Sequence, residues 1–227
     1  MSRASVFSLI VANLIVAVQA VRHEWGYYEL ILTYWVEVVI IGGYNVLRLL
    51  VVGLIGAAPL GKWLGERVDL GGVLNRLVWT ILGVGFFVVK FGGFAIGIGL
   101  MVALLPAFLK EAGAGSSGVL HALRMAGPGL LTSAGVLCLS HGISFVRNFL
   151  ARREYDRFNM MVLAFWPYAR MTAVGVVLVG GLVLARIWPG LGGRTGFAVV
   201  IVLLKLCADL ATHALEHRSL ATELGSG

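Results

Sequence analysis

The most regular chemical pattern in this sequence lies in its last apolar run. Lys205, Asp209 and His213 follow one another at intervals of four residues, and Glu216 and His217 come next. Steps of four residues rotate by only about 40° around a helix, so these side chains share one stripe. Such a stripe is typical of an ion-pair ladder that anchors a helix, of a path for protons or cations, or of a metal site.

The metal interpretation requires ligands from more than one helix. Asp209 and His213 would be joined by His141 or Glu37 from other apolar runs. Histidines four residues apart can chelate one ion, but the glutamate that lies between them in protease helices is missing. The candidate metal ligands are His141, Asp209, His213 and His217, and a divalent metal ion is the cofactor that they would hold.

Other apolar runs also contain isolated polar or charged residues. An ionisable side chain at membrane depth costs several kcal/mol unless it is paired or faces water, so such residues are the natural place to look for function. The candidate binding residues are Glu37, Asn45, Lys90, Ser140, His141, Arg170, Lys205, Asp209 and His213. We expect Glu37, His141 and Asp209 to converge inside the protein, because mutual pairing avoids leaving buried charges alone.

The composition indicates that these residues lie in a membrane protein. Hydrophobic residues make up 59% of the 227 positions and charged residues only 13%, and the mean hydropathy is +0.93. One water-soluble core of this size cannot bury so much apolar surface, so most of it must face lipid. We therefore expect an all-α fold, a polytopic bundle of transmembrane helices.

Six apolar runs are long enough to cross the hydrocarbon layer. They cover residues 5–21, 28–55, 77–109, 129–149, 160–187 and 196–212, and we assign all of 1–227 to one transmembrane domain. The first run also resembles a secretory signal, but we interpret it as the first membrane helix. The third is too long for one straight span and contains Lys90, so we expect a break at Gly92-Gly93.

Several function classes lack support. The 18 basic residues are dispersed in short connections, which argues against nucleic acid as a partner. There is no phosphate-binding loop, dinucleotide fingerprint, nucleophile elbow or paired-cysteine motif. Cys138 and Cys207 both lie in apolar runs, where a small buried hydrophobe is the ordinary interpretation.

The sequence resembles an uncharacterised family of prokaryotic multi-span membrane proteins along most of its length. The residues that carry the resemblance are Tyr28-Glu29-Leu30, Tyr34-Trp35-Val36-Glu37, Tyr44-Asn45-Val46-Leu47, Ser140-His141, Phe145, Asn148-Phe149, Pro167-Tyr168, Arg170, Lys205, Asp209-Leu210, His213 and Glu216-His217. The resemblance implies the cytoplasmic membrane of a prokaryote as the location. It names no reaction, because no activity is assigned to that family.

Three hypotheses about function follow from these patterns. The first is the binding or permeation of a small solute, proton or ion through a polar centre between the second, fourth and sixth helices. The second is a membrane-embedded, metal-dependent enzyme that uses His141, Asp209 and His213 as ligands and Glu37 as the general base. The third is a scaffold or accessory subunit, in which the charges only pair with one another. The lipid bilayer is a partner in all three hypotheses. A second copy of the chain or another protein of a membrane complex is a further partner that they allow.

Basic residues in the connections predict the orientation of the chain. With six spans, two basic connections lie on the same side as both termini. One contains Lys62, Arg67 and Arg76, and the other contains Arg147, Arg152, Arg153 and Arg157. The opposite side holds fewer basic residues, so the positive-inside rule places both termini in the cytoplasm. Reporter fusions at Gly115 and Gly227 should therefore report opposite sides of the membrane. The same location for both fusions would contradict the model of six spans.

Overall fold

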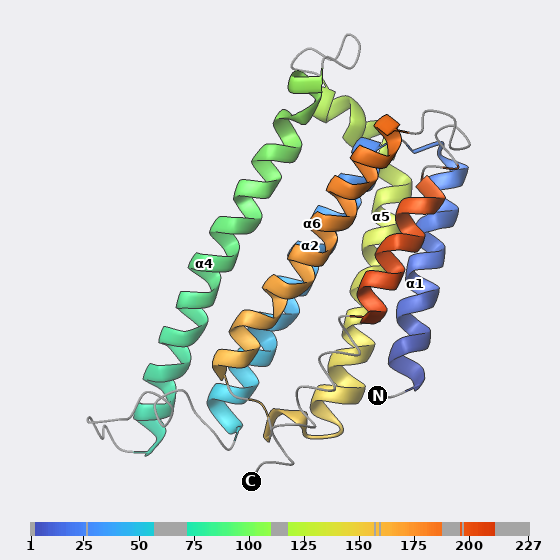
Figure 1. The fold of residues 1–227 in the computed structure, drawn as a ribbon. Coiled ribbons are helices and arrows are strands. Elements are labelled where there is room, and N and C mark those ends of the chain that lie inside the picture. The colour runs from blue at the N-terminus through green and yellow to red at the C-terminus, as the bar shows by residue number, and fades with distance from the viewer. Residues whose placement is uncertain are drawn as a thin grey trace.

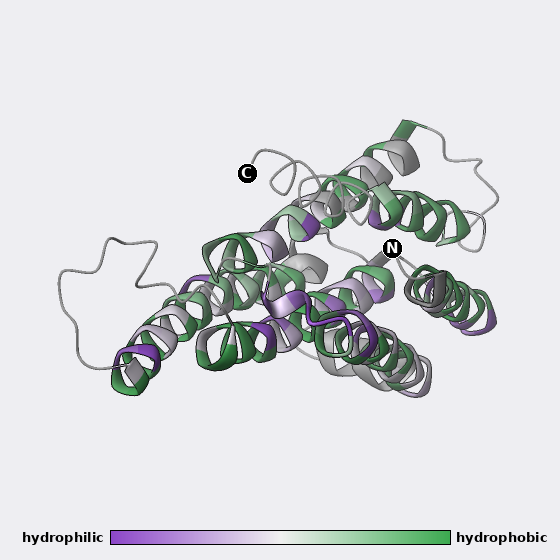
Figure 2. Ribbon diagram, turned by 90° about the horizontal axis from the view of Figure 1, so that it is seen from below, coloured by the Kyte–Doolittle hydropathy of each residue, from purple (hydrophilic) through white to green (hydrophobic). Residues whose placement is uncertain are grey.

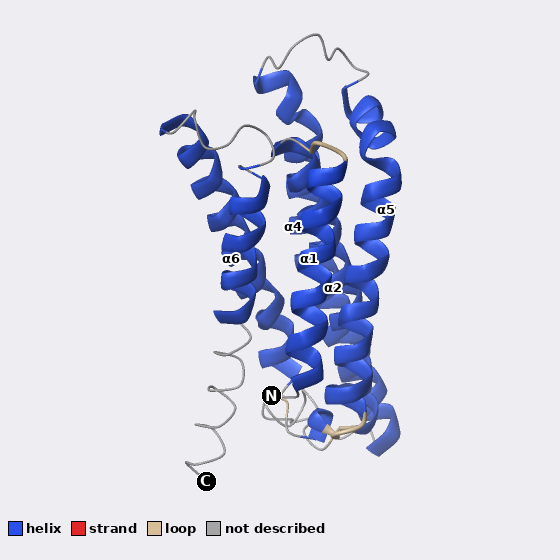
Figure 3. Cartoon of the chain, turned by 90° about the vertical axis from the view of Figure 1, so that its right-hand side faces the viewer, coloured by secondary structure: helices blue, strands red, loops and turns tan. Residues whose placement is uncertain are grey.

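The computed structural model describes residues 3–25, 27–56, 72–109, 118–156, 158, 160–187, 196 and 198–211, and all regular secondary structure in them is helical (Figure 3). The long helices are α1 (Arg3–Arg22), α2 (Tyr27–Ile55), α4 (Gly72–Leu109), α5 (Gly118–Ser144) and α6 (Met160–Ile187). A last helical stretch covers residues 198–211. Each of the six predicted apolar runs thus corresponds to a helix, as expected for an all-α bundle.

The helices run up and down in alternation (Figure 1). The start of α1 and the end of the stretch 198–211 point toward the same end of the bundle. α2 is the central element, because it packs against α4, α5 and α6, whereas α1 packs chiefly against α5. This arrangement brings helices from distant parts of the sequence around the middle of α2.

Within the described residues, four helices are long and apolar enough to cross a membrane, so the chain is a membrane protein. The qualifying segments are Tyr28–Ile55, Gly72–Leu104, Gly127–Leu150 and Met160–Val177, and Val6–Arg22 is a shorter apolar helix. Apolar residues lie along the surfaces of the helices, whereas hydrophilic residues gather in connections such as 151–156 (Figure 2). Exposed large side chains such as Val89 and Phe7 are therefore suited to lipid contact.

The predicted break at Gly92-Gly93 is wrong, because α4 is one uninterrupted helix of 38 residues. Phe87, Phe91 and Ala95 recur every four residues on its buried face and hold it against the bundle. Breaking the helix would leave backbone groups without partners in a medium that offers none. At about 1.5 Å per residue, α4 is roughly 57 Å long and extends beyond a hydrocarbon layer of about 30 Å.

Close contact between α2 and α4 depends on small residues and one polar anchor. A Cβ atom on Gly42 would overlap the ring of Phe91, and one on Gly53 would overlap the side chain of Thr80. The indole Nε1 of Trp35 donates a hydrogen bond to the carbonyl oxygen of Ala95 across the interface, at 2.9 Å. These contacts follow the general pattern of membrane helices, where small residues let backbones approach.

The helical pitch changes at the C-terminal end of α5. α5 continues directly into a π-helical turn, Phe145–Leu150, in which the amide of Ala151 donates to the carbonyl of Val146 at 2.9 Å. The wider turn keeps Asn148 and Phe149 buried, and a short 3₁₀ turn, Glu154–Asp156, leads on toward α6. Such turns occur frequently at functional sites.

We predict that Gly42→Leu will destabilise the protein by about 1–3 kcal/mol, the usual cost of overpacking, because the new side chain must displace Phe91. The matched control is Gly43→Leu, since a Cβ at the adjacent glycine meets nothing within 4 Å. Thermal unfolding of detergent-purified protein measures both. Equal melting temperatures for the two variants would show that the α2–α4 contact is looser than described.

Candidate functional site

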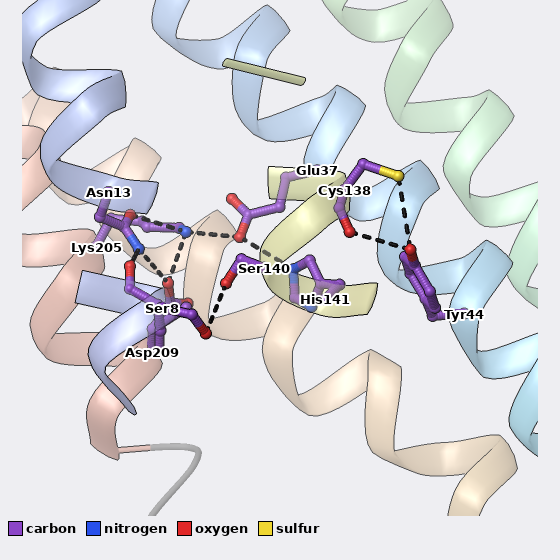
Figure 4. A network of polar contacts seen from close by, with 10 residues as sticks. Ser8, Asn13, Glu37, Tyr44, Cys138, Ser140, His141, Lys205 and Asp209 are labelled. Atoms are coloured by element: carbon purple, nitrogen blue, oxygen red, sulfur yellow. Dashed lines mark hydrogen bonds and ion pairs between the residues drawn. The ribbon is translucent and has the colours of Figure 1, made fainter. Parts of the chain in front are cut away.

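A lysine ammonium lies at the centre of a buried polar cluster (Figure 4). Lys205, on the last helix, has a fully buried side chain, and its Nζ lies 2.7 Å from Glu37 Oε1 and 2.6 Å from Asp209 Oδ2. It also donates a hydrogen bond to Asn13 Oδ1 at 3.1 Å. The ammonium therefore has three oxygen partners, as many as it has protons to donate.

The partners of Lys205 come from three helices. Glu37 lies on α2, Asn13 on α1, and Asp209 follows Lys205 by one turn on the last helix. The buried face of that last helix includes Ala198, Ile201 and Val202, which pack against α1, α2, α5 and α6 and place Lys205 in the interior. The position of the cluster is thus set by apolar packing around it.

Two contributors were not predicted from the sequence. Asn13 Nδ2 donates to the carbonyl of Leu9 at 3.0 Å and contacts Asp209 Oδ2 at 3.5 Å, which ties α1 to the last helix. The buried ring of Tyr34 lies 5.5 Å from Lys205 Nζ, within the range of a cation–π contact. The signal for Asn13 was its position in the middle of the first apolar run, where a carboxamide needs a partner.

The predicted convergence of Glu37, His141 and Asp209 is confirmed. Lys205 joins the two carboxylates, and His141 Nε2 on α5 lies 3.7 Å from Glu37 Oε1. That separation is longer than a direct hydrogen bond. Among the described residues, neither His141 Nε2 nor the second carboxylate oxygen, Glu37 Oε2, has a hydrogen-bond partner.

His141 also lines a hollow between α2, α5 and α6. The free volume in this hollow is about 30 Å³. This is room for roughly two water molecules, since each needs about 10–15 Å³. The residues that line it are Ile41, Tyr44, Asn45, Arg48, His141, Trp166, Pro167 and Arg170. The imidazole thus has the buried cluster on one side and this pocket on the other.

One wall of the pocket depends on a proline in α6. Pro167 lies inside the helix and has no N–H, so the carbonyl of Leu163, four residues earlier, lacks its ordinary helical donor. Asn45 Nδ2 donates to that carbonyl at 3.0 Å. The predicted candidate Asn45 therefore joins α2 to α6 and satisfies a backbone group that the membrane interior would otherwise leave unpaired.

An apolar layer lies on one side of the cluster along the helix axes. On each helix it begins about one turn from the polar residue, in the direction away from the end of α2 at Ile55. Its members are Val16, Tyr34, Leu137, Val174 and Ile201. Each lies three or four residues from the polar residue of its own helix, which is Asn13, Glu37, His141, Arg170 or Lys205 in the same order. The polar centre is therefore covered on that side by packed side chains.

The remaining candidates fall into different places. Ser140 donates to Ser8 Oγ at 3.3 Å beside the cluster, and Arg170 lines the pocket. Lys90 does not reach the site, because it lies on the exposed face of α4 with Nζ 6.0 Å from the centre of the Phe86 ring. His213 and His217 lie outside the described residues.

The described residues contain no group of three histidine, cysteine, aspartate or glutamate side chains arranged to hold a metal ion. Between Glu37 and Asp209, the position that a divalent cation would take is filled by the Lys205 ammonium. The metal hypothesis for His141 and Asp209 thus requires Lys205 to move, and its two further ligands are among the residues not described.

The chain matches a family of unknown function (DUF6498) over residues 1–224 and therefore belongs to that family. No curated protein and no solved structure matches it. Membership agrees with the expected resemblance to an uncharacterised membrane family and assigns no activity.

We predict that Lys205→Met will destabilise the protein by about 3–5 kcal/mol, because it leaves two buried carboxylates without their shared cation. The matched control is Lys90→Met, which removes an exposed lysine of another helix and should change stability by no more than about 0.5 kcal/mol. Unfolding in detergent measures both. Combining Lys205→Met with Glu37→Gln and Asp209→Asn should recover part of the loss, and no recovery would argue against charge pairing as its cause.

Proposed function

We propose that this member of the family binds and transfers a proton at the Glu37–His141 pair, as part of the permeation of a small solute or ion. The observation that carries the proposal is the position of His141, which lies 3.7 Å from a buried carboxylate and also lines a pocket. Ionisable groups that connect a buried cluster to a cavity are typical of proton relays in membrane proteins.

The unsatisfied atoms of this pair support a proton as the transferred species. Glu37 Oε2 and His141 Nε2 are buried, and neither has a hydrogen-bond partner in the described part of the chain. A proton on either group would convert an acceptor into a donor, so a small rearrangement could join the two side chains directly. Glu37 remains anchored meanwhile, because its other oxygen contacts Lys205 at 2.7 Å.

The charged surroundings of His141 would control its protonation. Glu37 faces it from α2, Arg170 from α6 and Lys205 from the last helix, and the Tyr44 ring lies near it, tilted by 37°, with ring centres 6.3 Å apart. The carboxylate favours the imidazolium, whereas the two cations oppose it.

Access would come from the end of the bundle where α2 finishes. Glu37 and Arg48 are eleven residues apart on α2, about 16 Å along the helix, and Arg48 lines the pocket on the side nearer Ile55. With both termini in the cytoplasm of a prokaryote, as the basic residues predict, the pocket faces the cytoplasm. The apolar layer would then separate the polar centre from the outside, and it must open for solute to cross.

Proton transfer can be measured in proteoliposomes that contain a pH-sensitive dye and carry an imposed membrane potential. We expect proton flux above that of empty liposomes, and Glu37→Gln and His141→Gln should reduce it to the empty-liposome rate. The matched control Glu24→Gln makes the same chemical change at an exposed position between α1 and α2 and should retain the flux.

Infrared difference spectra distinguish binding from transfer. Changing the pH between about 5 and 8, where an ordinary histidine changes charge, should alter a protonated-carboxyl or imidazole band that Glu37→Gln or His141→Gln removes. Such a band without flux would limit the pair to binding a proton. Neither a band nor flux would refute the proposal and favour the scaffold hypothesis, in which the charges only pair.

A further inference from the structure

The pocket beside His141 is lined by positive charge and polar side chains. Arg48 lines it from α2 and Arg170 from α6, together with His141. Tyr44 and Asn45 also line it, but the Tyr44 hydroxyl donates to the carbonyl of Cys138 and Asn45 donates to that of Leu163, each at 3.0 Å. Trp166 and other side chains of α6 and α2 provide apolar surface around them. No carboxylate forms an ion pair with Arg170 in the part of the chain that the structure describes.

The two acidic residues of the buried cluster are engaged by Lys205. Glu37 directs Oε1 to Lys205 at 2.7 Å, and Asp209 lies 2.6 Å from the same ammonium. Lys205 therefore neutralises carboxylates that could otherwise balance the pocket. The Arg170 guanidinium lies at membrane depth, where a charge is costly, so its wall of the pocket favours an anion.

Both arginines are held in place by the helices around them. Arg48 Cζ lies 5.5 Å from the centre of the Phe149 ring, a side chain that the π-helical turn keeps buried. Arg170 follows Pro167 by three residues on α6, and the hydrogen bond from Asn45 to Leu163 fixes this part of α6 against α2. Arg48 and Arg170 thus line one small space from two different helices.

We infer that this pocket binds a carboxylate group of a small organic acid, which is the solute class for the proposed proton-linked permeation and so rests on that proposal. Arginine donates two parallel hydrogen bonds to a planar carboxylate. The free volume of about 30 Å³ suits a chemical group of a few heavy atoms. His141 would lie between the bound carboxylate and Glu37, so a proton on the imidazole would be attracted by both.

Acetate is the simplest probe, and thermal unfolding of the full chain in non-ionic detergent measures its binding. Sodium acetate should raise the melting temperature along a saturating curve, whereas sodium chloride at equal ionic strength should not, because binding to the folded state alone stabilises it. Arg170→Gln should weaken acetate binding about tenfold or more, the effect of losing a charge-assisted hydrogen bond. The matched control Arg147→Gln removes an exposed arginine of the π-helical turn and should leave the acetate response unchanged.

A second variant and a second signal cover the case in which Arg170→Gln does not fold. Arg170→Lys keeps the charge but loses the planar fork, so it should fold and bind acetate more weakly. Trp166 lines the pocket, and acetate should change tryptophan fluorescence in the wild type but not in Trp166→Phe. Absence of both the thermal shift and the fluorescence change would overturn the inference.

Other ligands give different outcomes. Stabilisation by inorganic phosphate but not by acetate would overturn the assignment to a carboxylate, and stabilisation only by added phosphatidylglycerol would assign the arginines to a lipid headgroup. The two proposals also fail separately. Proton flux without an acetate response would refute the carboxylate site alone, whereas an acetate response without flux or an infrared band would refute proton transfer alone.

Discussion

The ion pairs of one fully buried lysine constrain the arrangement of the bundle. Removing an ammonium and two carboxylates from water costs several kcal/mol per ion, and only close, multiple contacts offset that cost. Lys205 meets the requirement by contacting Glu37, Asp209 and Asn13 at 3.1 Å or less. Since these partners lie on α1, α2 and the last helix, helices from both ends of the sequence must come together at one level of α2.

A second joint lies about two turns away along α2, where Asn45 replaces the backbone donor that Pro167 removes from α6. The lysine cluster and this joint fix α2 against different neighbours. His141 lies beside Glu37 of the first, and the pocket that it lines extends past Asn45 of the second to Arg48. α5 contributes His141 from a helix that neither joint holds directly. This helix continues into the π-helical turn, which begins four residues after His141, and such turns occur frequently at functional sites.

Sequence reasoning identified the helices and several of the buried polar residues, but not how they pair. Lys90, Cys138 and Cys207, which were also expected in the interior, are exposed. The convergence of Glu37, His141 and Asp209 followed from the cost of isolated charge in lipid. Asn13 and Tyr34 were missed because a lone carboxamide or phenol in an apolar run gives no clue to its partner. The break at Gly92-Gly93 was wrong because glycine permits a bend without requiring one, and packing of Phe87, Phe91 and Ala95 decided the outcome. The bond from Asn45 to Leu163 spans 118 residues and required the structure.

The separation of Glu37 from Lys205 in sequence has a consequence for synthesis of the chain. The two residues are 168 positions apart, and at about 5–20 residues per second the ribosome needs roughly ten to thirty seconds to travel from one to the other. During that interval α2 has left the ribosome, and the cation that neutralises its carboxylate does not yet exist. The nascent helix must therefore wait protonated, hydrated or sheltered by the insertion machinery. Final closure of the bundle is consequently a late event, and chains released before the last helix would expose the acidic residue to membrane quality control.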